Sequence, residues 1–323
     1  SFQGDEIRVT RRFKDFPSGD AILPNDVTLF SDAQYQEASE MLVPFDPSAE
    51  IEWSPVWSLR DKCFKYLPTG LFYKGPGDEQ IHSADSNGCA AGNTLEEAIV
   101  QGFLELVERD AYAIWWYNRL RRKALDLGQF DDSYIHDLEI QLAETGRRLW
   151  VLDVTSDLEI PSYVAVAHWL ENSRERVEFG SGAHFVPRIA VLRALTELNQ
   201  FLSIGLAGGR APEEELRLVD HPYLTPSGNA MVRPNLTSKF SHLDKGEQVM
   251  SCVRLAKRAG LDFLVLDQTR PDIEVPVVRV IVPGLRHFYR RFASGRLYDA
   301  PVKLGLLDRP LREHELNPLF PRT

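Results

Sequence analysis

Two glutamates in a strongly apolar segment are the residues of this chain best suited to chemistry. Glu105 and Glu108 lie three residues apart in the run 94–118, whose other positions are mostly aliphatic or aromatic. Residues at this spacing share one face of a helix, and a helix that is apolar on its other faces is usually buried. Two buried carboxylates repel each other unless a positive charge neutralises them. The pattern predicts a divalent-cation site, and the alternative is a stripe that faces water.

The helix that carries this pair is expected to run from about Thr94 to Asn118. Thr94 followed three residues later by Glu97 is the capping-box pattern of a helix start. Gln101 lies on the same face as the two glutamates and lengthens the polar stripe. Small turn residues at 83–93 precede the helix, and they could either let the backbone approach an anion or form an ordinary loop.

A second apolar helix, predicted over 188–200, repeats this pattern. Arg193, Glu197 and Gln200 share one of its faces, and aliphatic residues cover most of the rest. Arg279 lies inside an apolar strand pattern, where it needs an anionic partner, either a ligand or a structural carboxylate. Carboxylates, an amide and arginines without a histidine suit a hard cation such as Mg²⁺ together with phosphate oxygens.

Composition excludes several classes of partner. The 323 residues carry a formal net charge of −10, which argues against nucleic acid or a membrane surface as the main partner. Cys63, Cys89 and Cys252 lie far apart, so neither a zinc site nor a disulfide framework is indicated, and a reducing, cytoplasmic location is expected. No signal peptide or bilayer-spanning run is visible. Because the first residue is Ser1 rather than Met, the sequence could be a fragment of a longer chain.

An internal repeat predicts the fold class. A helix, a glycine, a buried strand, a short loop and a second strand occur in this order around Gly146 and again around Gly260. We therefore expect an α/β (α+β) fold with duplicated helix–strand–strand halves around one cleft.

The repeat also predicts the organisation of a single domain, 1–323. The expected parts are an irregular N-terminal part with strand-like runs at 64–66 and 71–73, a first half, a second half and a tail, at about 1–80, 81–200, 201–300 and 301–323. The chain has no Gly-Lys-Ser/Thr P-loop, no His-Glu-x-x-His zinc motif and no serine nucleophile elbow. The run 180–182 matches only the beginning of a dinucleotide-binding loop.

Five separated motifs resemble those of the YcaO family, and more narrowly its azoline-forming cyclodehydratases (D proteins) from the biosynthesis of ribosomal peptides such as thiazole/oxazole-modified microcins. They occur in the family's order, and the resemblance covers most of the chain from about residue 50. The motifs are Ser-Asn-Gly-Cys-Ala-Ala-Gly-Asn-Thr-Leu-Glu-Glu-Ala-Ile, Glu-Leu-Val-Glu-Arg-Asp-Ala, Gly-Ala-His-Phe-Val-Pro-Arg-Ile-Ala, Arg-Ala-Leu-Thr-Glu-Leu-Asn-Gln and Val-Ile-Val-Pro-Gly-Leu-Arg-His-Phe.

The resemblance implies a YcaO-like fold with mixed sheets and helices around a central ATP cleft, and it implies an enzyme. Such enzymes use ATP and Mg²⁺ without a P-loop. A Cys, Ser or Thr side chain of a precursor peptide attacks the preceding backbone carbonyl, ATP phosphorylates the resulting oxygen, and loss of phosphate leaves a thiazoline or oxazoline. Phosphorylation turns a poor leaving group into a good one, and metal and arginine would stabilise the charge on the transferred group.

The resemblance also assigns roles to individual residues. It implies that Mg²⁺ binds to Glu105, Glu108 and Glu197, and that Arg279, Glu197 and Pro321 take part in catalysis. ATP contacts are implied for Ser86, Asn87, Gly92, Gln101, Arg109, Arg193, Gln200 and Arg279. The chain departs from the family in three ways: Gln101 takes a place that is often Ser, Ala91-Gly92 lacks the usual lysine, and the tail after Asn317 has two prolines rather than a clear Pro-x-Pro-x-Pro.

The implied partners are a ribosomal precursor peptide, a leader-binding E1-like protein or fused domain, a flavin-dependent azoline dehydrogenase and a second copy in a homodimer. Neither nucleic acid nor a membrane is among them. Three alternatives stay open. A YcaO enzyme could make a thioamide or an amidine, a non-catalytic YcaO-like scaffold could bind a peptide, and a carboxylate-only metallohydrolase would act without nucleotide.

Overall fold

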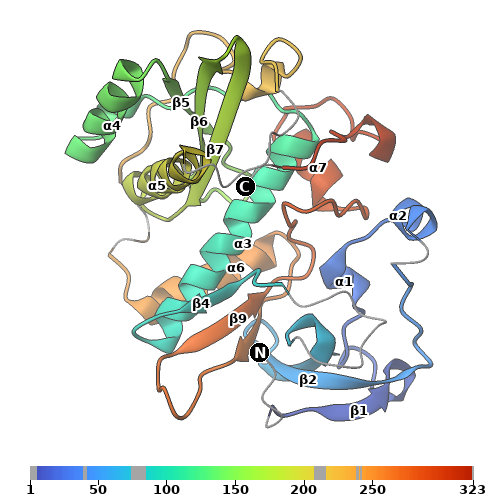
Figure 1. The fold of residues 1–323 in the computed structure, drawn as a ribbon. Helices are drawn as coiled ribbons and strands as arrows, with labels where there is room; N and C mark the ends of the chain where they lie inside the picture. The colour runs from blue at the N-terminus through green and yellow to red at the C-terminus, as the bar shows by residue number, and fades with distance from the viewer. Residues whose placement is uncertain are drawn as a thin grey trace. The chain divides into compact units, whose positions relative to one another are not determined.

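The computed structural model describes residues 6–38, 42–73, 85–206, 216–237, 240 and 242–321 (Figure 1). The chain divides into two compact units. Unit 1 comprises Ser1–Leu106 and Leu243–Arg296, and unit 2 comprises Val107–His242 and Leu297–Thr323. Among the described residues, no helix is both long and apolar enough to cross a membrane.

Unit 1 is built on a six-stranded antiparallel sheet in the order β1-β2-β8-β9-β4, in which β3 also pairs with β2. Its core contains the buried side chains Trp53, Leu67, Leu264 and Ile281. The strands are β1 (Val9–Arg12), β2 (Glu50–Ser58), β3 (Cys63–Pro68), β4 (Cys89–Ala91), β8 (Leu264–Asp267) and β9 (Val277–Ile281). The helices are α1 (Asn25–Thr28), α2 (Asp32–Glu37), α6 (Lys245–Arg258) and the first part of α3 (Leu95–Tyr117).

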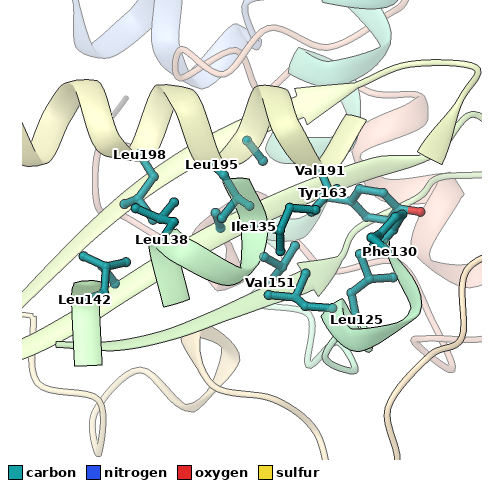
Figure 2. Close-up of a cluster of buried hydrophobic side chains, with 14 of the residues drawn as sticks. Leu125, Phe130, Ile135, Leu138, Leu142, Val151, Tyr163, Val191, Leu195 and Leu198 are labelled. Atoms are coloured by element: carbon teal, nitrogen blue, oxygen red, sulfur yellow. The ribbon is translucent and has the colours of Figure 1, made fainter. Parts of the chain in front are cut away.

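Unit 2 is built on a three-stranded antiparallel sheet, β5-β6-β7. Figure 2 shows its core, where side chains of α4 and α5 meet side chains of the sheet, among them Leu138, Leu195 and Val151. The strands are β5 (Arg148–Asp153), β6 (Ser162–Glu171) and β7 (Arg174–Ala183). The helices are α4 (Ser133–Glu144), α5 (Pro187–Leu206), the rest of α3 and most of α7 (Arg296–Lys303).

The predicted repeat is present in both units. In unit 2, α4 is followed by Gly146, β5 and β6, and in unit 1, α6 is followed by Gly260, β8 and β9. Both glycines have a positive φ, +71° and +77°, which is the left-handed conformation that ends a helix. Glu159 and Glu274, at matching places between the two strands of each copy, also have positive φ values of 57° and 59°. The α/β prediction with duplicated helix–strand–strand parts is therefore confirmed.

The N-terminal part is more regular than predicted. The run 64–66 lies in β3, but Leu71 lies in a 3₁₀ turn (Thr69–Leu71) rather than in a strand, because Pro68 and Gly70 favour a turn there. Strand β2 was not predicted; it pairs with β1, β3 and β8. These pairings join residues before 106 to residues after 243 within unit 1. The predicted division of a single domain 1–323 into its parts stays a prediction.

Glycines let β7 approach α5 closely. A Cβ atom on Gly180 would lie 2.2 Å from the Ala194 oxygen, and one on Gly182 would lie 2.3 Å from the Ala190 oxygen. The Gly-Ser-Gly run, which resembled the beginning of a dinucleotide loop, is thus a strand that packs under a helix.

We expect Gly180→Ala to lower the free energy of unfolding by about 1–3 kcal/mol, since the new methyl group must push backbone atoms apart. Urea unfolding followed by circular dichroism would measure the change. Gly246→Ala is the matched control, because a Cβ there meets only the Asp244 side chain at 3.4 Å within α6. Equal stability of the two variants would contradict the close approach of β7 and α5.

Candidate functional site

Helix α3 begins at the residue predicted, with a different partner for its first-turn glutamate. The Glu97 backbone N–H donates to the Thr94 hydroxyl at 3.2 Å, as expected for a cap. The Glu97 carboxylate, however, accepts from the backbone and the side chain of Asn93, at 3.0 and 2.8 Å, instead of from Thr94. Glu97 therefore stabilises the first turn of the helix. The residues of the polar stripe that are candidates for chemistry lie further along α3.

In unit 1, Glu105 of α3 holds the turn that precedes β4. Its carboxylate accepts from the Gly88 N–H at 3.1 Å, and the Gly88 oxygen accepts from the Val280 N–H of β9 at 2.8 Å. Gly88 has φ +78°, and a Cβ there would lie 2.1 Å from the Val280 oxygen. Gly102 of α3 is equally constrained, because its Cβ would lie 2.7 Å from the Gly88 oxygen. Gly88 and Gly102 therefore allow α3, the turn before β4 and strand β9 to pack closely together.

In unit 2, Glu108 of α3 and Glu197 of α5 share Ser181 of β7. The Ser181 hydroxyl lies 2.7 Å from the Glu108 carboxylate and 3.0 Å from the Glu197 carboxylate. A hydroxyl has one proton and can donate to only one of them. Backbone N–H groups satisfy further oxygens, since Ser181 donates to Glu197 at 2.5 Å and Ala183 donates to Glu108 at 3.2 Å. Two carboxylates are therefore close together around one hydroxyl group.

Both units contain the same arrangement of a glycine-containing segment and a glutamate, which was not identified from the sequence. The spacing from Gly88 to Glu105 equals that from Gly180 to Glu197, and each glutamate accepts a backbone N–H from the segment of its glycine. Ser181 could have been found from this alignment, since it takes the place that Cys89 has in unit 1.

Arg279 is buried in β9, and its partner is Asp85. Its side chain is 8% exposed, and its Nη2 lies 2.8 Å from the Asp85 carboxylate. Nη1 donates to the Asp85 backbone oxygen at 2.6 Å, and the guanidinium lies over the Phe72 ring. The predicted anionic partner is thus a carboxylate of the chain, but within the described part of the chain the buried Nε atom has no acceptor. No described residue donates a hydrogen bond to the buried Oδ1 atom of Asn87 either.

The other predicted residues differ in exposure. Arg193 is half-buried and donates to the Ala183 oxygen at 3.1 Å; burial lowers the pKa of its guanidinium, and the nearby Glu108 carboxylate opposes this shift. Gln101 and Arg109 are half-buried on α3, whereas Ser86 and Gln200 are exposed. Gly92 lies against the start of α3, where a Cβ would be 2.6 Å from the Ala98 nitrogen.

In unit 2, Glu108 and Glu197 offer carboxylate oxygens, which Mg²⁺ prefers. In unit 1, the buried Arg279 Nε could donate to an anion, and the buried Asn87 Oδ1 could accept from a polar ligand. No three His, Cys, Asp or Glu side chains among the described residues come together as a ready metal cluster. The assignment of Glu105, Glu108 and Glu197 to Mg²⁺ therefore stays a prediction.

Cys89 of β4 faces Arg279 of β9 in unit 1 but is poorly suited to act as a nucleophile. Burial raises the pKa of its thiol, and the positive charge of Arg279 offsets this only in part. A thiol with a raised pKa stays protonated at neutral pH, whereas the thiolate is the reactive form. Covalent catalysis through Cys89 is therefore disfavoured.

The segment that precedes Pro321 is hydrogen-bonded to the end of α3 in unit 2. Asn317 is 2% exposed, its backbone N–H donates to the Tyr117 oxygen at 2.7 Å, and its side chain donates to the Trp116 oxygen at 3.2 Å. The Trp116 indole donates to the Leu319 oxygen at 2.9 Å. Pro321 is buried, so the tail is ordered up to this residue rather than frayed.

Deleting 320–323 is expected to lower peptide dehydration about tenfold or more, because a positioning segment is lost, while ATP affinity stays unchanged. The cut keeps Asn317 and its bonds to α3, so the fold should survive. Nucleotide titration calorimetry and mass spectrometry of the peptide product measure the two effects separately. Wild-type dehydration would mean that the tail is dispensable, and joint loss of ATP binding would indicate a folding defect instead.

The comparisons with known proteins decide the family. The family model described as YcaO cyclodehydratase, ATP- and Mg²⁺-binding, matches residues 1–286. The chain belongs to the YcaO family. Its fold is similar to that of a heterocyclase in complex with substrate and cofactor, with a TM-score of 0.90 and 47% identity over 98% of this chain. The heterocyclase TruD is similar to the same degree, with a TM-score of 0.90 and 45% identity over 100% of this chain.

A more distant YcaO relative extends the comparison. The YcaO protein of Methanopyrus kandleri bound with AMPPCP and Mg²⁺ matches with a TM-score of 0.65 and 25% identity, over 86% of this chain and 70% of that one. The chain spans only about half the length of the two heterocyclases, 46% and 48%. The predictions of a YcaO fold and of membership of an ATP- and Mg²⁺-binding family are therefore confirmed, and the activity of the whole protein is a separate question.

Proposed function

We propose that this YcaO protein is an ATP- and Mg²⁺-dependent cyclodehydratase that converts Cys, Ser or Thr residues of a ribosomal precursor peptide to thiazolines or oxazolines. The observation that carries the proposal is the match with a substrate-bound heterocyclase, at 47% identity over 98% of the chain. The shared hydroxyl between Glu108 and Glu197 supports it independently, because this pair suits a divalent cation.

Each group has a distinct task in this proposal. Bound ATP supplies a phosphoryl group to the amide oxygen and Mg²⁺ neutralises charge on its phosphates. Glu108 and Glu197 hold the cation, while Glu105 keeps the Gly88 turn in place. Arg279 and Asn87 offer the unsatisfied Nε and Oδ1 atoms to the nucleotide. The Arg193 guanidinium adds a positive group beside Glu108.

The reaction balances without a further reagent. The side-chain sulfur or oxygen of the peptide forms a bond to the preceding carbonyl carbon, and the former carbonyl oxygen leaves with the phosphoryl group as inorganic phosphate. The nucleophile loses its S–H or O–H proton and the amide nitrogen loses its N–H proton, which gives the ring C=N bond. The products are ADP, phosphate and a peptide that lacks one water.

The expected partners follow from the same proposal. The heterocyclase relatives are about twice as long as this chain, so leader recognition would reside in a fused segment or in a separate E1-like protein. The flavin-dependent azoline dehydrogenase and the homodimer stay predictions from the family resemblance.

A direct test is to incubate the protein with candidate precursor peptides from its genomic neighbourhood, a leader-binding partner, ATP and Mg²⁺. Mass spectrometry should show loss of water at Cys, Ser or Thr, with phosphate released in equal amount. A mass gain from sulfur or loss of water at a backbone amide would indicate a thioamide or amidine product. Peptide binding without phosphate release would indicate a scaffold, and turnover without nucleotide would indicate a metallohydrolase.

A further inference from the structure

Asp85, which no motif singled out, contacts three segments of unit 1. Its Oδ1 accepts from the Asn87 N–H at 2.9 Å and from Arg279 Nη2 at 2.8 Å, and its backbone oxygen accepts from Arg279 Nη1 at 2.6 Å. Its Oδ2 lies 3.6 Å from Nε2 of His287. A single carboxylate thus links the turn that carries Asn87, the guanidinium of β9 and the imidazole that follows β9.

His287 is itself held in a defined orientation. Its Nδ1 accepts from the Tyr289 N–H at 3.1 Å, so the neutral ring carries its proton on Nε2, which faces Asp85. The Tyr289 ring stacks on the imidazole with centroids 4.3 Å apart and planes 7° apart. The side chain is only 11% exposed. The second oxygen of Asp85 therefore faces an imidazole of fixed orientation, whereas the first accepts two hydrogen bonds.

The other repeat copy lacks this arrangement. In the strand register, Arg279 faces Cys89 and Val164 faces Ser181, so Val164 takes the place of Arg279 in unit 2. Asp85 precedes Cys89 by the same number of residues as Val177 precedes Ser181. Both members of the Asp85–Arg279 pair are thus replaced by valine in a copy with the same helix–strand–strand order. The pair is not required to form this substructure.

We propose that Asp85 is the positioning residue of the nucleotide-binding turn, which sets Asn87 and Arg279 in place before ATP arrives, while His287 faces its second oxygen. The inference rests on the proposed function, because Asn87 and Arg279 are the groups assigned there to ATP. The physical basis is preorganisation. A long arginine side chain and a turn that are ordered in advance do not lose that freedom on binding, so more of the binding energy is realised.

Two substitutions separate the roles of Asp85. Asp85→Asn keeps an oxygen that can accept from the Asn87 N–H but removes the charge that faces Arg279 and His287, whereas Asp85→Ala removes both. Asp46→Ala is the matched control, because this exposed aspartate closes the same type of turn, on the Ser48 N–H at 2.8 Å. Hydrogen exchange of amides 86–89 in the nucleotide-free protein reports on the turn, and titration with AMPPCP and Mg²⁺ reports on binding.

For Asp85→Ala we expect exchange of these amides to rise about tenfold or more, and both AMPPCP affinity and kcat/KM for ATP to fall about a hundredfold. Asp85→Asn should exchange like the wild type, with a kcat about tenfold lower because Arg279 loses its charged partner. Asp46→Ala should match the wild type throughout.

Wild-type exchange, affinity and kinetics in both Asp85 variants would overturn the proposal, and so would a lowered melting temperature with unchanged affinity and kinetics. If Asp85→Ala does not fold, Asp85→Asn decides through its kcat and AMPPCP affinity. Should the wild type bind AMPPCP and Mg²⁺ without dehydrating any peptide, the proposed function fails, while exchange and affinity still decide the role of Asp85.

Discussion

Glu108→Gln should abolish ATP-dependent peptide dehydration, with a loss of at least about a hundredfold in kcat, while the protein stays folded. The single oxygen of glutamine can still accept from the Ala183 N–H, and its amide NH₂ group can donate to the Ser181 hydroxyl oxygen, so the local structure should persist. Its neutral amide is a weaker ligand for Mg²⁺. The change also removes repulsion from Glu197, so the melting temperature without metal should stay equal or rise. Phosphate release and differential scanning calorimetry measure the two effects.

The matched control is Glu96→Gln, an exposed glutamate in the first turn of the same helix. It should leave dehydration and stability unchanged. Full activity in Glu108→Gln would remove the metal-site assignment, and a large drop in melting temperature would mean that the carboxylate has a structural role instead. Glu105→Gln is expected to lose activity too, although its carboxylate accepts from the Gly88 N–H and its effect includes the position of that turn.

Arg279→Ala should lower kcat/KM for ATP by about a hundredfold, which is the scale of one lost buried, charge-assisted contact. Peptide affinity should change far less, because the arginine is assigned to the nucleotide. The guanidinium has an unsatisfied Nε, and no arginine occupies the equivalent place in unit 2. Steady-state kinetics with ATP varied, together with peptide binding by fluorescence anisotropy, would check both statements.

A double variant separates this function from a purely structural ion pair. Arg279→Ala leaves the Asp85 carboxylate without its partner, which costs stability. Arg279→Val combined with Asp85→Val copies the valines of unit 2 and should recover the melting temperature without recovering ATP turnover. Recovery of turnover in the double variant would show that the arginine only balances Asp85.

Features that depend on local chemistry could be predicted from the amino-acid sequence. The cap at Thr94, the apolar periodicity of α3 and α5, and the glycines that end α4 and α6 are set by residues within a few turns of each other. The buried character of Arg279 also followed from its apolar neighbours. Helix periodicity and helix ends act over short distances in the chain, so one sequence sufficed to predict the repeat and the family's motifs.

The contacts among these side chains, in contrast, depend on the tertiary fold. Glu105 and Glu108 look equivalent in the sequence. In the structure, Glu105 accepts a hydrogen bond from the Gly88 turn, whereas the carboxylates of Glu108 and Glu197 both contact the Ser181 hydroxyl. Gln200, on the same predicted stripe as Glu197, is exposed. Asp85 pairs with Arg279, and β2 pairs with β8. In both cases the partners lie about two hundred positions apart in the sequence. Such contacts depend on strand register and on close approach at glycines, and no local pattern of residues encodes either of these.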